Sequence, residues 1–160
     1  MRRASHGLTV VLAMTAAAAA LAASAQPANG KSCRPSSISE APNDSYRPGS
    51  PVRSSSGKGH VLSGAVLVRE TCRAIARARI EFFQSGPSGQ YSNGPSWAGR
   101  ATVVTRADGS YRYESLFPSG GRPHIHMRVS APGFKMLHTT YFAKPGRTNV
   151  RFSFVLEPAS

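Results

Sequence analysis

Acidic residues are scarce in this chain of 160 residues, which holds 7 Asp and Glu against 20 Lys and Arg and has a formal net charge of +13. The cations are scattered and form no run longer than two, and no nucleic-acid-binding motif is present. We therefore predict no nucleic-acid partner. A basic surface would still attract small aromatic anions or anionic polymers of the cell envelope through its long-range field.

Long apolar segments are also lacking, apart from Leu8–Ala22 near the start. This run has about 15 residues and is too short to span a bilayer comfortably. It follows the basic Met1-Arg2-Arg3 and precedes the small residues Ala23-Ser24-Ala25, the layout of a secretory signal peptide. We predict a signal peptide at 1–25, cleaved near Ala25-Gln26, and a secreted, periplasmic or cell-envelope protein with no transmembrane segment. The paired arginines also permit a twin-arginine export signal.

Only two cysteines occur, Cys33 and Cys72, and both remain after cleavage. In an oxidising compartment an even pair favours one disulfide. It would connect the irregular N-terminal part to the first hairpin. The alternative is two separate buried thiols.

A helical period is absent from the whole mature chain. Residues 26–58 are rich in Pro, Ser, Gly and Asn, which predicts an extended N-terminal arm. Residues 59–160 form short segments of period two, separated by turn signals such as Ala107-Asp108-Gly109 and Pro132-Gly133. This pattern predicts an all-β fold, a single β-sandwich of seven to eight short strands. The expected strands are His60–Arg69, Ala76–Gln84, Arg100–Arg106, Ser110–Leu116, Pro123–Ala131, Phe134–Phe142 and Asn149–Leu156.

The segment most suggestive of chemistry is Pro123-His124-Ile125-His126. Residues two apart on a strand project from the same face, so His124 and His126 present two neighbouring imidazoles. Such a pair suits zinc, copper or iron. Taken alone, the same spacing also fits two hydrogen-bonded or solvated histidines.

The chain resembles the intradiol ring-cleavage dioxygenase family over about 100 residues, because several short pieces occur in the order typical of that family. These pieces are Gly64-Ala65-Val66, Cys72, Ile80-Glu81-Phe82-Phe83, Gly89-Gln90-Tyr91, Gly99-Arg100, Asp108-Gly109-Ser110-Tyr111-Arg112-Tyr113, Pro123-His124-Ile125-His126, Thr139-Thr140-Tyr141-Phe142 and Arg151-Phe152-Ser153-Phe154-Val155-Leu156.

The resemblance implies a non-haem Fe(III) site that opens catechol-type rings between the two hydroxyl-bearing carbons and incorporates both atoms of O2. By position, Tyr91, His124 and His126 match metal ligands, and Arg122 matches an arginine that stabilises charge on the bound ring. Such a guanidinium stays protonated.

Three features depart from the family pattern. The second tyrosine ligand is missing, because 117–121 reads Phe-Pro-Ser-Gly-Gly. The spacing from Arg122 to His124 is one residue tighter, and Thr140 stands where a glutamine is usual. Two functions remain open. The first is a secreted iron dioxygenase acting on a small aromatic diol and O2, for which the resemblance allows a homodimer. The second is an impaired member serving as a metal- or ligand-binding module at the cell envelope. A zinc or copper site with different chemistry is the third possibility.

Overall fold

The computed structural model describes residues 33, 40, 43–92 and 95–160. The predicted signal peptide at 1–25 and part of the predicted arm lie outside the described residues. Within the described ranges the regular structure consists of strands alone, and no helix long enough and apolar enough to cross a membrane occurs there.

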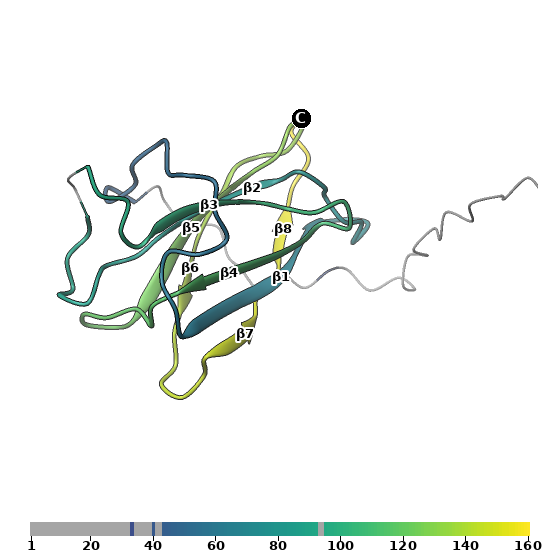
Figure 1. Ribbon diagram of the computed structural model, residues 1–160. Helices are drawn as coiled ribbons and strands as arrows, with labels where there is room; N and C mark the ends of the chain where they lie inside the picture. Colours follow the sequence, from purple (N-terminus) through teal and green to yellow (C-terminus); the bar gives the residue numbers. More distant parts are fainter. Residues whose placement is uncertain (1–32, 34–39, 41–42, 93–94) are drawn as a thin grey trace, which may run out of the picture.

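Eight strands pack as two sheets, as the period-two pattern predicts (Figure 1). The all-β sandwich is therefore confirmed. The first sheet has the order β4-β1-β7, with β8 also paired to β1, and the second has the order β3-β2-β5-β6. The strands are β1 (His60–Val68), β2 (Arg79–Phe83), β3 (Arg100–Val104), β4 (Ser110–Ser115), β5 (His124–Ser130), β6 (Leu137–Phe142), β7 (Asn149–Arg151) and β8 (Phe154–Leu156).

The last predicted strand is divided into β7 and β8, which both run parallel to β1. Between them the chain comes very close to Gly64, where an added Cβ would lie 2.3 Å from the Phe152 carbonyl oxygen. The Ala65 N–H is bonded to the Ser153 hydroxyl, at 3.3 Å, in place of a main-chain acceptor. This side-chain bond interrupts the ladder, so one predicted strand becomes two.

The core lies between the two sheets and is built from alternate residues of each strand. On β5, Ile125, Met127 and Val129 are buried in it, which turns His124 and His126 to the outer face of the second sheet. On β4, Tyr111 and Tyr113 face inward, and Tyr113 stacks on Phe82 with ring centroids 4.0 Å apart. The two tyrosines are thereby committed to packing.

The outer face of the second sheet is covered by the segment 43–55, which we call the arm. Ser50 and Thr102 share a buried hydrogen bond of 2.8 Å. Around the bridge to Val52, the main-chain N–H of Thr102 donates to the Pro51 carbonyl and the Thr102 carbonyl accepts from the Arg53 N–H. Because of this cover, Glu81 on β2 and Arg100 on β3 are buried although they face away from the core. The arm thus makes a second interior beside His126.

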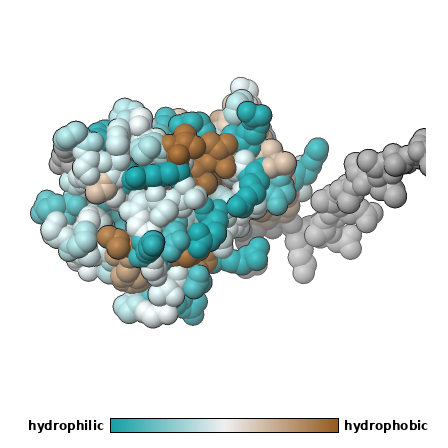
Figure 2. All heavy atoms as spheres, in the orientation of Figure 1, coloured by the Kyte–Doolittle hydropathy of each residue, from teal (hydrophilic) through white to brown (hydrophobic). Residues whose placement is uncertain are grey.

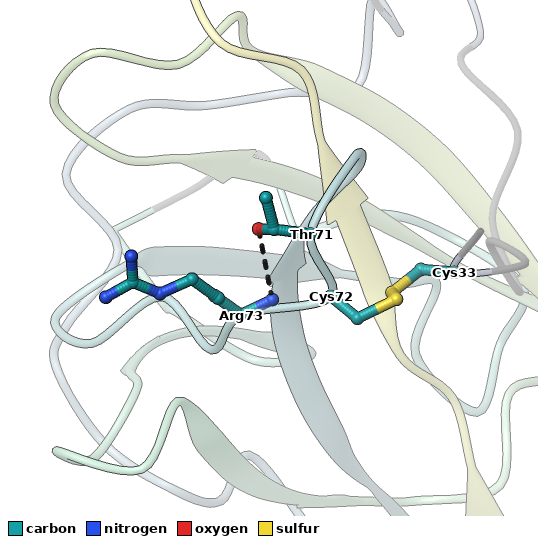
Figure 3. Close-up of a disulfide and its surroundings, with 4 residues drawn as sticks. All are labelled: Cys33, Thr71, Cys72 and Arg73. Carbon is teal, nitrogen blue, oxygen red and sulfur yellow. Dashed lines mark hydrogen bonds between the residues drawn. A yellow bond between two sulfur atoms is a disulfide. The ribbon is translucent and has the colours of Figure 1, made fainter. Parts of the chain in front are cut away.

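A disulfide joins Cys33 to Cys72, with the Cα atoms 5.4 Å apart, and confirms the predicted pairing (Figure 3). Cys72 lies in the loop after β1, between Thr71 and Arg73. The bond therefore fixes the start of the chain to the turn region of the first sheet.

The molecular surface seen in Figure 2 is mixed, with small hydrophobic patches separated by hydrophilic residues. The large apolar side chains that are exposed in the described residues are Val52, Val104, Leu116, Phe117, Met136 and Phe142. The homodimer suggested by the sequence stays a prediction.

Candidate metal centre

Tyr91 and the two histidines come together at the end of the second sheet. The phenol oxygen of Tyr91, in the loop after β2, lies 3.2 Å from Nε2 of His124. The rings of His124 and His126 have centroids 4.6 Å apart and are nearly perpendicular, and the Tyr91 ring is 6.2 Å from that of His126. The three side chains that the sequence selected thus share one location.

The hydrogen bonds fix which ring nitrogen of His124 carries its lone pair. Nδ1 of His124 is 2.6 Å from the main-chain carbonyl oxygen of Arg122, which can only accept a hydrogen bond. Nδ1 therefore carries the proton, and Nε2 accepts the bond from the Tyr91 hydroxyl. The lone pair of Nε2 points toward the phenol oxygen.

His126 is fixed in the same way by residues from the arm and from β6. Its Nδ1 is 2.8 Å from the Thr140 hydroxyl, and its Nε2 is 3.2 Å from Nδ2 of Asn43. Its ring stacks on Phe83, with centroids 5.1 Å apart. Burial, with the neighbouring His124, lowers the pKa of His126 to about 4. The imidazole is neutral at physiological pH, and its Nε2 carries the lone pair that accepts the bond from the Asn43 amide.

Tyr91 is half-buried, and this burial raises the pKa of its phenol. The positive charge of Arg100 opposes the rise and favours the phenolate. Arg100 is itself 1% exposed, and its guanidinium donates to the main-chain carbonyls of Ser45 and Ser92. No carboxylate forms an ion pair with it among the described residues. A buried cation thus stands beside the candidate ligand.

The sequence did not indicate a role for Arg100 beyond its place in the ordered pieces. Arg100 pairs with Phe83 and lies on the same face of the sheet. A buried cation at this position indicates a nearby anion or anionic ligand. The contacts of Asn43 and of Glu40, whose carboxylate accepts a 2.6 Å bond from Thr140, had no sequence signal at all.

Arg122 lies next to the histidine pair, since its carbonyl holds His124. Its guanidinium stacks 3.8 Å above the ring of Phe142, which in turn is 6.1 Å from the His124 ring. The side chain is exposed. Its position at the rim of the site is established, and the catalytic role stays a prediction.

The donor set fits a metal ion. Three donors bonded to one ion at about 2 Å stand roughly 3 Å apart, which the Tyr91–His124 pair matches. In both histidines Nδ1 donates to an oxygen, the second-layer arrangement usual for metal-binding histidines. No group of three or more His, Cys, Asp or Glu side chains in the described ranges could hold a metal, so the site depends on the phenol.

A small cavity of about 70 Å³ adjoins His126 on the side of the arm. The lining residues are Glu40, Asn43, Phe83, His126, Met127, His138 and Thr139.

No family model and no curated protein sequence matches this chain. Solved structures do. The dioxygenase domain of a dioxygenase and carbohydrate-binding fusion protein from Streptomyces sp. SirexAA-E is 26% identical, with a TM-score of 0.64 over 79% of this chain and 100% of that domain. Catechol 1,2-dioxygenase from Acinetobacter radioresistens is 19% identical, with a TM-score of 0.61 over 72% of this chain and 60% of its own. The 3-chlorocatechol 1,2-dioxygenase from Rhodococcus opacus is 17% identical, with a TM-score of 0.63 over 79% of this chain and 73% of its own.

This chain has the fold of the intradiol ring-cleavage dioxygenases, at low sequence identity. It matches the full length of the Streptomyces domain but only 60% of the Acinetobacter catechol dioxygenase. The resemblance drawn from the ordered sequence pieces is therefore confirmed for the fold.

The resemblance implies a second tyrosine ligand in the segment 117–121, which holds no tyrosine. In the segment 117–121, Phe117 turns its ring against His60 instead, with centroids 5.4 Å apart. The open face of His126 is occupied by the amide of Asn43. Tyr111 and Tyr113, the nearest tyrosines in sequence, are buried in the core and cannot supply the missing phenol.

Proposed function

We propose that this protein is a secreted non-haem iron(III) dioxygenase that cleaves catechol-type aromatic diols with O2. The observation that carries the proposal is the convergence of the Tyr91 phenol and the paired histidines, with Nε2 lone pairs on both rings. Phenolate and imidazole donors suit iron, and the fold is shared with a catechol 1,2-dioxygenase and a 3-chlorocatechol 1,2-dioxygenase.

Tyr91, His124 and His126 would hold the ion, and Fe(III) held by a phenolate would make the ring of a bound catechol reactive toward O2. Tyr91 loses its phenol proton on binding, and Arg100 offsets the charge of the resulting phenolate. The Arg122 carbonyl and Thr140 keep the two imidazoles in the required tautomer. Arg122, at the rim, would stabilise negative charge on the bound ring.

Export is part of the proposal. The disulfide between Cys33 and Cys72 supports an oxidising compartment, and the N-terminal segment has the pattern of a signal peptide. Removal of residues 1–25 leaves 18 Lys and Arg and 7 acids, a net charge of +11. The mass of the exported protein should correspond to a chain that begins at Gln26 and contains the disulfide.

The experiment is iron loading under air, followed by addition of catechol. We expect a visible tyrosinate-to-iron band, uptake of one O2 per catechol and a ring-opened diacid containing both oxygen atoms. Tyr91→Phe should abolish the band and the uptake. Tyr141→Phe is the matched control, because Tyr141 faces the core from β6 and should leave both unchanged.

The second candidate is a binding module without ring cleavage, and the absence of a second tyrosine supports it. The contact between the Asn43 amide and Nε2 of His126 also supports the binding module, because a metal ion would have to displace this amide to reach Nε2. A protein that stays colourless after iron loading and consumes no oxygen would favour this candidate. Tight binding of zinc or copper in the same experiment would favour a site with different chemistry.

A further inference from the structure

Two residues at the start of the described chain reach the same imidazole from opposite sides. Glu40 is anchored to β6 by its main-chain N–H, which donates to the His138 carbonyl at 2.7 Å. Its carboxylate accepts a bond from the Thr140 hydroxyl at 2.6 Å, and that hydroxyl is 2.8 Å from Nδ1 of His126. Asn43 contacts Nε2 of the same ring.

The donor and the acceptor of each of these hydrogen bonds follow from the chemical groups involved. The main-chain N–H of Ser45 donates to Oδ1 of Asn43 at 2.8 Å, which places the NH2 group of Asn43 toward His126. An amide NH2 can only donate, so Nε2 of His126 accepts and Nδ1 carries the proton. Nδ1 then donates to Thr140, whose own proton goes to the Glu40 carboxylate, since an ionised carboxylate only accepts.

We propose that Glu40 and Thr140 form a positioning relay that keeps the proton of His126 on Nδ1 and its lone pair on Nε2, the nitrogen that the Asn43 amide contacts and that a metal ion would take over. The use of that lone pair for metal rests on the proposed function, whereas the relay itself is a property of this chain. His124 needs no such relay because the Arg122 carbonyl lies next to it. The Nδ1 partner of His126 is instead the Thr140 hydroxyl. This hydroxyl links the imidazole to the Glu40 carboxylate, which belongs to the N-terminal part of the chain.

The relay explains why a threonine suits this position. Its hydroxyl donates a hydrogen bond to the Glu40 carboxylate and can therefore only accept one from the imidazole. The imidazole must then carry its proton on Nδ1. Valine has the same shape and can do neither. Thr140→Val therefore breaks both bonds with little change in volume, whereas Thr140→Ser keeps the hydroxyl.

The first test needs no metal and no activity. The ring nitrogens of His126 are observed by nitrogen NMR in the labelled, metal-free protein, which reports the tautomer. We expect the Nδ1–H form in the wild type and in Asn43→Ala, where the relay alone fixes the proton, and a shift toward the Nε2–H form when Thr140→Val, but not Thr140→Ser, is added to Asn43→Ala. Thr139→Val is the matched control, since its side chain is buried and points to the other face of β6. An unchanged tautomer when Thr140→Val is combined with Asn43→Ala overturns the relay, as does a shift produced by Asn43→Ala alone.

The second test measures Co²⁺ affinity by titration of the metal-free protein, with the visible absorption of bound cobalt as the signal. Loss of an outer hydrogen-bond partner lowers metal affinity by about 10- to 100-fold. We expect that loss for Thr140→Val, a smaller one for Glu40→Gln, which keeps an acceptor without its charge, and near-wild-type affinity for Thr140→Ser. Affinities within twofold of wild type for both Thr140→Val and Glu40→Gln overturn the relay. A wild type that binds neither cobalt nor iron overturns the proposed function, and the tautomer measurement then still decides the relay.

Discussion

The ion pair between Glu81 and Arg128 offers a sharp test of how the arm is held on the sheet. The Arg128 guanidinium is 2.5 Å from the Glu81 carboxylate, and their side chains are 25% and 7% exposed. The hydroxyl of Tyr46, on the arm, donates to Glu81 at 3.0 Å and accepts from Arg128 at 2.9 Å. The pair therefore joins β2, β5 and the arm beneath the candidate site.

Glu81→Gln removes the negative charge and leaves Arg128 without its ionic partner. Breaking a buried pair costs about 3 to 5 kcal/mol of stability. The Arg128 side chain is 25% exposed and keeps its bond to Tyr46. We therefore expect a smaller loss of unfolding free energy, about 2 to 3 kcal/mol. Arg128→Met should cost a similar amount. The double variant should lose less than the sum by about 1 to 3 kcal/mol, because neither charge is then left alone.

Urea unfolding followed by circular dichroism measures these free energies. The matched control is Glu114→Gln, whose partner Arg112 is 3.3 Å away and half exposed, and which should cost less than about 1 kcal/mol. Single losses below about 0.5 kcal/mol that simply add in the double variant would refute the reasoning. They would mean that the pair contributes nothing to holding the arm.

Two further predictions concern stability. Replacing both Cys33 and Cys72 by serine should lower the free energy of unfolding by up to about 4 kcal/mol, because the bond closes a loop across a sequence separation of 39, and the double variant should lose the sensitivity to reductant that the wild type shows. Burial lowers the pKa of His60, so the unfolded chain binds a proton first as the pH falls below about 6.5, and the unfolding free energy should decrease there. His60→Leu should flatten that decrease between pH 7.5 and 5.5 without removing the part due to His126 and His138, whose pKa values are also lowered. An equal slope in wild type and variant would contradict the assignment to His60.

The strands and the turns were predictable because they depend on neighbouring residues. The alternation along β5 assigned Ile125 and Met127 to the core and His124 and His126 to the opposite face, and the pleat of a strand makes that assignment local. The loop position of Tyr91 was also correct. Its proximity to His124, across 33 residues, came from the family resemblance and not from any local pattern.

Sequence alone therefore determined the all-β class, the facing of the histidine pair and the pairing of the only two cysteines. Tertiary structure decided what surrounds the pair: Glu40 lies 100 residues from Thr140 in sequence, and Asn43 lies 83 residues from His126. It also decided that Arg100 is buried beside Tyr91 and that β7 and β8 pair in parallel with β1. The physical reason is that periodicity and turn residues act over a few positions, whereas these contacts join residues far apart in sequence and exist only in the folded chain.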